Sequence, residues 1–268
     1  MSRQAVCQTE SRLQARAKEL LIVKELVLGM RMKMPRIGTR KLYYLLKNKL
    51  ESMHIKIGRD ALFKYLKSEQ LLIKRKHNYT RTTYSNHWLR KHPNLMVDRV
   101  PKHIEEVFVS DITYIKSYQG THYLSLVTDA FSRRIMGYKL SDDMRSESVV
   151  QTLTMACKNK RTKRNTIHHS DRGLQYCSSI YQTELLKHSM KPSMTDGYDC
   201  YQNALAERIN GILKQEFLYI KCKSIDELSK LVAYAINTYN NLRPHLALNY
   251  KTPNFIHNKK PVELTQLV

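Results

Sequence analysis

Hydrophobic residues recur at helical spacing in the first third of the chain. Ser11 and Gln14 resemble a capping box, which marks the start of a helix. The apolar positions that follow keep the helical period and predict a helix over about 12–30; they are Leu13, Ala17, Leu20, Leu21 and Leu28. Pro35 and Gly38 then interrupt the pattern, so the helix is expected to end before them.

Two shorter helices are predicted after this break. Thr39 is placed to cap a helix through Leu50, whose buried side carries Leu42, Leu45, Leu46 and Leu50. A third helix, from Arg59 to about Ser68, places Leu62, Phe63 and Leu66 inward and Arg59, Lys64 and Lys67 outward. Short helices joined by tight breaks fit a helix-turn-helix whose last, basic helix enters a DNA major groove. A small helical bundle with a solvated basic face is the alternative.

The periodicity fades between residues 73 and 105. Basic residues gather at 74–77 and 90–92, and prolines at positions 93 and 101 interrupt any helix. We interpret this segment as a basic linker that follows DNA phosphates. Its Trp88, the single tryptophan of the chain, either packs on a domain, which is the commoner fate of a tryptophan, or stacks on a base.

Strand-like alternation begins after the linker. It predicts strands over 107–115, 122–128, 134–140 and 166–169, and helices over 146–158, 203–217 and 224–241. Three successive strands followed by helix, strand and helix indicate an α/β fold with a mixed sheet. The predicted organisation is a helical domain over 1–72, a basic linker over 73–105, and an α/β domain with a C-terminal helical extension over 106–268.

Charge sharpens this division. The chain carries a formal net charge of +23, of which residues 1–105 contribute +16 and residues 106–268 contribute +7. So much uncompensated positive charge calls for a polyanionic partner; nucleic acid is the first candidate and an anionic membrane surface the second. No apolar run approaches the ~18 residues of a membrane span, and the N-terminus lacks a signal pattern, so a cytoplasmic protein is expected.

The cysteines and histidines narrow the chemistry further. Five widely separated cysteines, none in a C-x-x-C pair, indicate neither a disulfide framework nor a zinc knuckle. The eleven histidines form no H-x3–5-H pair near a cysteine, which argues against a zinc finger. His168 and His169 end a predicted strand, where they either orient substrate or pack; packing is the commoner role.

Three acidic residues fall at informative places. Asp111 lies within a predicted half-buried strand, Asp171 lies just past the end of another, and Glu207 lies near the start of a helix that carries Lys214 two turns later. A buried, unpaired aspartate is costly, so something is expected to neutralise Asp111. Singly, each acid fits a turn, a cap or a solvated face; together they suit a pair of Mg²⁺ ions about 4 Å apart at a phosphodiester.

At this point the residues resemble a known family. Asp111, Asp171 and Glu207, the last two separated by 35 residues, resemble the D, D(35)E signature of retroviral integrases and related bacterial transposases. Four ordered motifs are similar to those of the orfB-type transposases of the insertion sequence family three: SDITYI at 110–115, HSDRGLQY at 169–176, YQNALAE at 201–207 and YNNLRPHLAL at 239–248.

This resemblance implies an RNase H-like mixed sheet flanked by helices, preceded by a small all-α helix-turn-helix domain. It implies that Asp111, Asp171 and Glu207 hold two Mg²⁺ ions, with Mn²⁺ able to substitute, and that Lys214 contacts the end of the element. The implied reaction is strand cleavage followed by strand transfer without a covalent protein–DNA intermediate. Arg172 is expected to meet a phosphate.

The resemblance also implies partners and a location. We expect double-stranded DNA, both element ends and target, a homo-oligomer on DNA, a fusion to or partnership with an upstream reading-frame product, and a cytoplasmic, nucleoid-associated bacterial protein. Arg243 and His245, in the last motif, either border the site or form a turn. Two alternatives remain: a non-catalytic DNA-binding regulator or remnant of the element, and a purely hydrolytic nuclease.

Overall fold

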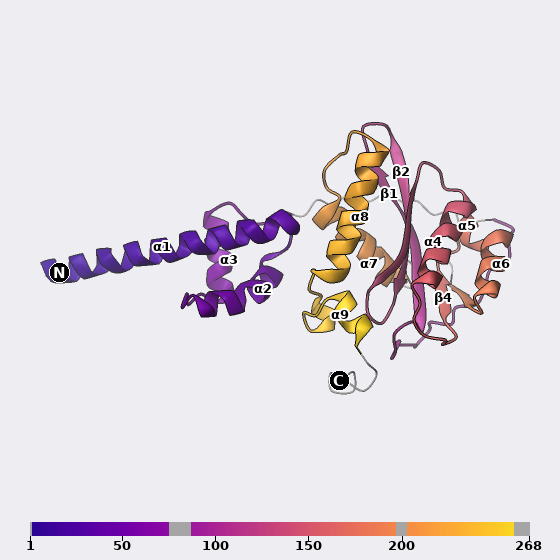
Figure 1. Ribbon diagram of the computed structural model, residues 1–268, viewed down its shortest axis with the longest axis horizontal. Helices are drawn as coiled ribbons and strands as arrows, with labels where there is room; N and C mark the ends of the chain where they lie inside the picture. Colours follow the sequence, from indigo (N-terminus) through magenta and orange to yellow (C-terminus); the bar gives the residue numbers. More distant parts are fainter. Residues whose placement is uncertain (1, 75–86, 197–202, 260–268) are drawn as a thin grey trace. The chain divides into compact units, whose positions relative to one another are not determined.

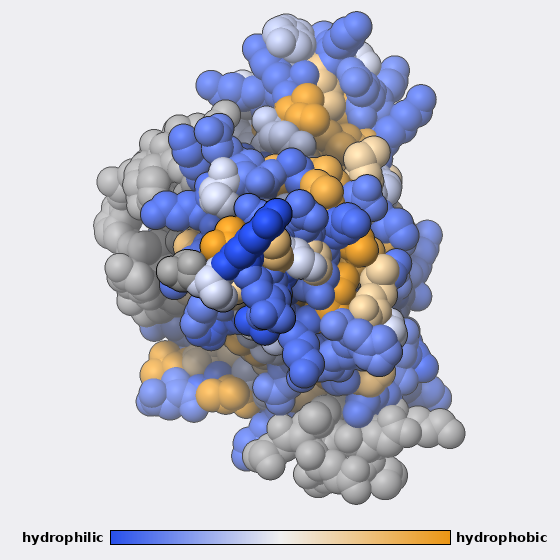
Figure 2. All heavy atoms as spheres, turned by 90° about the vertical axis from the view of Figure 1, so that its left-hand side faces the viewer, coloured by the Kyte–Doolittle hydropathy of each residue, from blue (hydrophilic) through white to orange (hydrophobic). Residues whose placement is uncertain are grey.

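The computed structural model describes residues 2–74, 87–196 and 203–259 (Figure 1). The chain divides into two compact units, residues 1–76 and residues 77–268, which are described separately below. None of the helices in these described ranges combines the length and apolar character needed to cross a membrane. Figure 2 shows hydrophilic residues over most of the face that it presents, with hydrophobic residues in small separate patches.

Three helices make up the described part of the first unit: α1 (Arg3–Lys33), α2 (Thr39–Ser52) and α3 (Arg59–Ser68). They share an apolar core to which each contributes residues at helical spacing: Val23, Val27, Leu42, Leu46, Leu50, Leu62 and Leu66. Helix α1 is longer than predicted and begins at Arg3, where the hydroxyl of Ser2 accepts a hydrogen bond from the Ala5 amide. The small α-helical arrangement expected from the periodicity is thus present.

Two details of the helix predictions were wrong. Gly38, not Thr39, is the N-cap of α2, and no side chain caps that helix. Phe63 was predicted to face inward, yet 49% of it is exposed. Leu62 and Leu66 lie one turn apart and form the buried stripe of α3, while Phe63 is rotated about 100° from Leu62 and falls on the open side.

A five-stranded mixed sheet forms the centre of the second unit, with strand order β3-β2-β1-β4-β5. The strands are β1 (Val107–Lys116), β2 (Thr121–Asp129), β3 (Ile135–Ser141), β4 (Ile167–Ser170) and β5 (Lys191–Met194). The first three pair antiparallel as a meander, and β4 and β5 run parallel to β1. This is the mixed α/β sheet predicted from the sequence.

Helices cover both faces of the sheet (Figure 1). Their bounds are α4 (Ser146–Lys158), α5 (Leu174–Cys177), α6 (Ser179–Lys187), α7 (Ala204–Ile212), the π-helix η2 (Leu213–Phe217), α8 (Ile225–Asn241), the 3-10 helix η3 (Leu246–Leu248) and α9 (Pro253–Asn258). Alternate residues of β1 serve different cores: Phe108 packs in the cluster with Leu153 and Tyr181, whereas Val107 and Val109 pack with Ala206 of α7. By the same alternation Asp111 shares the face of Val109, the face that α7 covers.

The elements around β5 had no counterpart in the sequence-based predictions. Strand β5 has only four residues, includes a proline and lies at the edge of the sheet, so it lacks an alternating pattern long enough to identify. Helices α5, α6 and α9, with four, nine and six residues, are also short and had no counterpart either. Short elements carry little periodicity, and here the neighbouring strands and helices determine them.

Residues 87–96, which we call the strap, belong to the second unit and form neither a helix nor a strand. Inward-facing and exposed residues alternate along much of it. Leu89 packs against the larger core, and Met96 packs against the smaller one. Of the two roles considered for Trp88, packing on a domain and stacking on a base, packing does not apply, because this side chain is 91% exposed. Residues 75–86 of the predicted linker lie outside the described residues.

Candidate active site

Parallel pairing of β1 and β4 places two of the predicted acids side by side. The register joins Val109 to His169. Asp111 lies two residues after Val109, and Asp171 lies two residues after His169, so the two aspartates extend from the same level of the sheet. Asp171 lies just past the last residue of β4, as the sequence predicted, at the strand end where α/β sheets present ligand sites.

Helix α7 brings the third acid over the same strand. The side-chain amide of Asn203, next to the first residue of α7, donates to the Ser110 carbonyl at 3.1 Å. The side-chain amide of Asn210 donates to Oδ2 of Asp111 at 2.8 Å. Glu207 lies one helical turn before Asn210 and therefore projects from the same side of α7. The two asparagines thus fix the helix that carries Glu207 against the strand that carries Asp111.

The three carboxylates influence one another electrostatically. Burial, together with the negative charges of Asp171 and Glu207, raises the pKa of Asp111 to about 7, against the opposing effect of the hydrogen bonds from Asn210 and the Ile112 amide. Burial and the charge of Asp171 also raise the pKa of Glu207. Neighbouring negative charges disfavour ionisation of a carboxyl group, and a cation among them would reverse that effect. The expectation that Asp111 requires neutralisation therefore has a structural basis.

The acids fit a hard divalent cation in their chemistry. Carboxylate oxygens are the ligands that Mg²⁺ prefers, and none of the three acids is fully buried. Within the ranges that the structure describes, no three histidine, cysteine or acidic side chains lie close enough, as placed, to share one ion. The Oδ1 atom of Asn210 adds a buried oxygen that accepts no hydrogen bond.

A glycine shapes the loop around Asp171. The amide of Gly173 donates to Oδ1 of Asp171 at 3.0 Å. A Cβ atom at Gly173 would lie 3.1 Å from that oxygen and 3.3 Å from Oε1 of Gln175, so any larger residue would push the carboxylate aside. Arg172, the predicted phosphate contact, donates from Nε to the Thr195 carbonyl at 2.6 Å and is partly exposed.

His168 and His169 belong to the core, which supports the packing role. The hydroxyls of Ser110 and Tyr181 each lie 2.7 Å from Nε2 of His168, and the hydroxyl of Ser193 lies 2.9 Å from Nδ1 of His169. Burial lowers the pKa of His168 to about 3, so its imidazole is neutral at physiological pH. These contacts lock β4 to β1 and β5 immediately before Asp171.

Lys214 lies on the π-helix that continues α7. Its ammonium donates to the hydroxyl of Thr113 at 3.1 Å, so a cation lies beside the strand of Asp111. Burial lowers the pKa of Lys214, and the charge of Asp111 opposes that effect. A π-turn inside a helix is uncommon and often marks a functional site. The sequence-based prediction of one helix over 203–217 missed it.

Arg243 is buried next to this π-helix, with 2% exposure. Its guanidinium makes two hydrogen bonds with the carboxylate of Glu216 in η2, at 2.7 and 2.6 Å, and a third contact of 3.0 Å with Nε2 of His245. The sequence left two interpretations of this motif, a border of the site or a turn; the structure adds a role that neither includes, because Arg243 is a buried clamp on the π-helix. Charged residues that pair far apart in sequence leave no local signal.

The other predicted DNA contacts lie in the first unit. Arg59, Lys64 and Lys67 are all exposed on α3, as predicted, and Arg59 pairs with Asp60 at 2.8 Å. Their outward placement suits a basic recognition helix. Their role stays a prediction.

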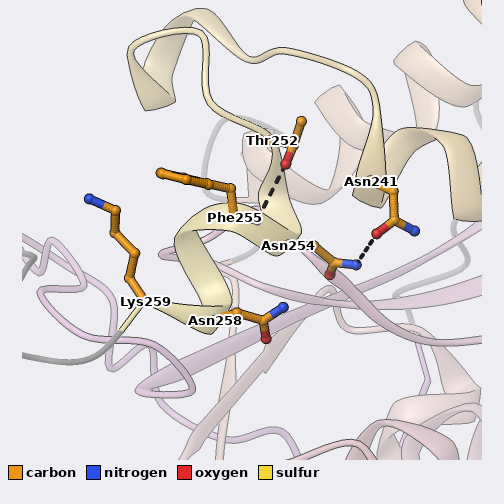
Figure 3. Close-up of a pocket in the computed structure, with 6 residues that line it drawn as sticks. All are labelled: Asn241, Thr252, Asn254, Phe255, Asn258 and Lys259. Carbon is orange, nitrogen blue, oxygen red and sulfur yellow. Dashed lines mark hydrogen bonds between the residues drawn. The ribbon is translucent and has the colours of Figure 1, made fainter.

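A shallow hollow lies apart from the acids, at the junction of α8 and α9 (Figure 3). It is lined by Asn241, Thr252, Asn254, Phe255, Asn258 and Lys259, and its volume is about 420 Å³. The amide of Asn254 donates to Oδ1 of Asn241 at 2.7 Å, and Lys259 lies over the Phe255 ring at 5.1 Å. No acid lines this hollow, so it is not the site of carboxylate chemistry.

Comparison with known proteins gives consistent similarities. The chain matches the family described as "Integrase core domain" over residues 101–200 and again over residues 188–253. It is 34% identical over 231 residues to the "Insertion element IS600 uncharacterized 31 kDa protein" of Shigella sonnei, covering 84% of this chain and 85% of that protein. It is 30% identical over 197 residues to "Transposase InsF for insertion sequence IS3A" of Escherichia coli K12, covering 72% and 68%.

A solved structure shares the fold. The chain is 20% identical to a chain of the simian T-cell lymphotropic virus intasome in complex with the PP2A regulatory subunit B56 gamma, with a TM-score of 0.51. The match covers 84% of this chain and 72% of that one. The arrangement of sheet and helices is therefore that of an integrase-type, RNase H-like core.

Proposed function

Because the chain belongs to the DDE transposases of the insertion sequence family three, we propose that Asp111, Asp171 and Glu207 are the acids with which it cleaves and joins DNA. Its class of activity follows from the family: it is an enzyme that acts on DNA during transposition. The alternative of a non-catalytic regulator is not favoured by its relatives. The assignment of roles to individual residues is our proposal.

One observation carries the assignment. The negative charges of Asp171, at the end of β4, and of Glu207, on α7, both raise the pKa of Asp111 on β1. Asp111 and Glu207 are nevertheless separated by 95 residues in sequence. A requirement for stability alone does not explain why three negative charges gather and raise the pKa of a partly buried aspartate. A site that binds cations explains this arrangement.

The proposed cofactor is a pair of Mg²⁺ ions held by Asp111, Asp171 and Glu207, with Mn²⁺ able to substitute. Bound there, the ions would activate the attacking hydroxyl and stabilise the leaving oxygen of a phosphodiester. Glu207 is exposed and can change rotamer to join the other two acids. Asn210 orients Asp111 through its hydrogen bond, and Gly173 does the same for Asp171.

Basic residues are proposed to hold the DNA. Lys214, hydrogen-bonded to Thr113, would contact a phosphate at the element end, and Arg172 would contact a second one. In the other unit, Arg59, Lys64 and Lys67 on α3 would follow a major groove. Double-stranded DNA of element ends and target is the proposed substrate, and a cytoplasmic, nucleoid-associated location follows from it. We also propose a homo-oligomer on DNA and cooperation with an upstream reading-frame product.

The test is the substitution Asp171→Asn in the full chain, assayed on DNA that carries the terminal inverted repeats of the element. The variant is expected to bind this DNA and, with Mg²⁺ or Mn²⁺, neither to cleave nor to join strands. Asp226→Asn, which changes an exposed acid on α8, is the matched control and is expected to stay active. Full activity of Asp171→Asn would remove Asp171 from the mechanism, and cutting without joining by the unmodified chain would indicate a nuclease.

A further inference from the structure

Trp88 is presented to solvent in a way that packing does not explain. It is the single tryptophan of the chain, and 91% of it is exposed. Tryptophan has one of the largest apolar surfaces of any side chain, and it is usually highly buried. Leaving it in water forgoes the stabilisation that burial would give. A partner that covers the indole would recover this stabilisation.

The backbone on both sides of Trp88 is anchored. Nε2 of His87 lies 2.7 Å from the carbonyl oxygen of Arg172, and Leu89 packs against the larger core. Further along the strap, the Leu95 amide donates to the hydroxyl of Ser193 at 2.9 Å. The strap therefore fixes the backbone on both sides of Trp88 while the indole points outward. The conformational entropy of this backbone is already lost in the free protein, so a partner that binds the indole does not have to order it.

The anchor places Trp88 beside the proposed acids. His87 contacts Arg172, which directly follows Asp171. With 3.8 Å between consecutive Cα atoms, the reach of one histidine side chain and the 2.7 Å contact of His87 with Arg172, the backbone of Trp88 lies within roughly 17 Å of Asp171. At 3.4 Å per base pair, this corresponds to about five base pairs of DNA. A phosphate at the acids would therefore bring its flanking bases within reach of the indole.

We propose that Trp88 stacks on a base of the DNA flanking the phosphate that reacts at the acids. Charge favours DNA as the occupant: Arg90 and Lys91 are exposed next to the indole, Arg172 is partly exposed, and no acidic residue occurs between positions 87 and 97. An aromatic ring with neighbouring cations is the combination that binds unstacked bases, because every base has a π-face and every nucleotide a phosphate. The inference rests on the proposed function for the position of the DNA.

The tryptophan itself reports the contact. Because the chain has no other tryptophan, its intrinsic fluorescence comes from Trp88 alone. Titration of the full chain with terminal inverted-repeat DNA, in the absence of divalent metal, is expected to quench this emission and to shield the indole from acrylamide. Emission that stays unchanged at saturating DNA overturns the proposal. So does a change that appears on concentrating the protein without DNA, which would assign the indole to a second copy of the chain.

Substitutions test the energetic part. Removing a stacked aromatic side chain weakens binding by about 5- to 150-fold, so Trp88→Leu is expected to lose affinity in this range, whereas Trp88→Phe keeps most of it. The dependence of affinity on salt should be unchanged, because stacking releases no counterions. The melting temperature should also be unchanged, since the side chain is exposed. Equal affinity of Trp88→Leu and the unmodified chain overturns the proposal.

A matched control lies in the same unit. Tyr118 is 71% exposed in the turn between β1 and β2, with the ammonium of Lys221 4.4 Å from its ring. Tyr118→Leu removes another exposed aromatic beside a cation but far along β1 from the strap, and it is expected to leave DNA affinity and quenching intact. The fluorescence titration needs no divalent metal and no catalysis, so its result is independent of the Asp171→Asn test. If the acids had no catalytic role, quenching of Trp88 by DNA would still be measurable.

Discussion

The clamp between Arg243 and Glu216 allows the sharpest prediction about stability. Both hydrogen bonds of the pair are short, at 2.7 and 2.6 Å, and the arginine is 2% exposed, whereas Glu216 is 16% exposed at its side chain. The perturbation is Glu216→Gln, which keeps the shape and removes the charge. It leaves a buried guanidinium without a charged partner; the glutamine oxygen can still accept one hydrogen bond, and the contacts with Nε2 of His245 and the carbonyl of Pro244 are unchanged.

The magnitude follows from this burial. Breaking a buried pair by removing one partner costs about 3–5 kcal/mol of unfolding free energy, because the other charge stays in a medium that solvates it poorly. For a domain of 150–250 residues each kcal/mol lowers the melting temperature by roughly 2–4 °C, so a fall of about 6–20 °C is expected. Replacing both partners by apolar residues, as in Glu216→Leu with Arg243→Met, should restore most of this loss.

Urea and thermal denaturation of Glu216→Gln and of the double variant measure the loss and its recovery. Asp143→Asn is the control, because Asp143 pairs with Arg145 on the surface at 3.2 Å, with 49% and 77% of the two side chains exposed, and such pairs contribute at most about 1 kcal/mol. A loss below about 1 kcal/mol for Glu216→Gln would refute the reasoning. Variants that fold should also join DNA ends poorly, since η2 carries Lys214 as well as Glu216.

Two further predictions follow from buried contacts. His257 lies between Glu105 and Asp129, which raise its pKa against the effect of burial, while hydrogen bonds lower the pKa of Glu105 to about 2. The stabilisation that Glu105 contributes is complete above its ordinary pKa of 4.5 and is lost as pH falls toward 2. The stabilisation that His257 contributes is complete below its ordinary pKa of 6.5 and is lost as pH rises through its raised pKa. Unfolding free energy measured against pH should therefore show a maximum between these values that His257→Gln flattens, and an unchanged profile would contradict the assignment. Gly137→Ala should lower stability, because its Cβ would lie 2.8 Å from the Ala156 amide of α4. Gly173→Ala should lower strand cleavage more than stability, because its Cβ would press on the carboxylate of Asp171. A larger loss of cleavage for Gly137→Ala and a larger loss of melting temperature for Gly173→Ala would count against both contacts.

Much of the fold was determined by local sequence patterns. The helix over 146–158 and the third helix from Arg59 to Ser68 have the bounds that were predicted, and β1 to β4 lie within one or two residues of theirs. These elements carry several repeats of their own period, so the chain encodes them locally. The mixed sheet followed from their order, and the chemistry of the three acids followed from residue type, placement and motif.

Tertiary structure decided what no local pattern encodes. The pairing register of β1 with β4, set by the whole sheet, brings Asp111 level with Asp171, and α7 crosses β1 to add Glu207. Only the folded chain shows that Trp88 is exposed and that Arg243 is buried, because these outcomes depend on partners many positions away. Periodicity is a property of neighbouring residues, whereas burial and charge pairing are properties of contacts between distant ones. The sequence alone therefore specified the elements and the reactive groups, and packing specified where each group points.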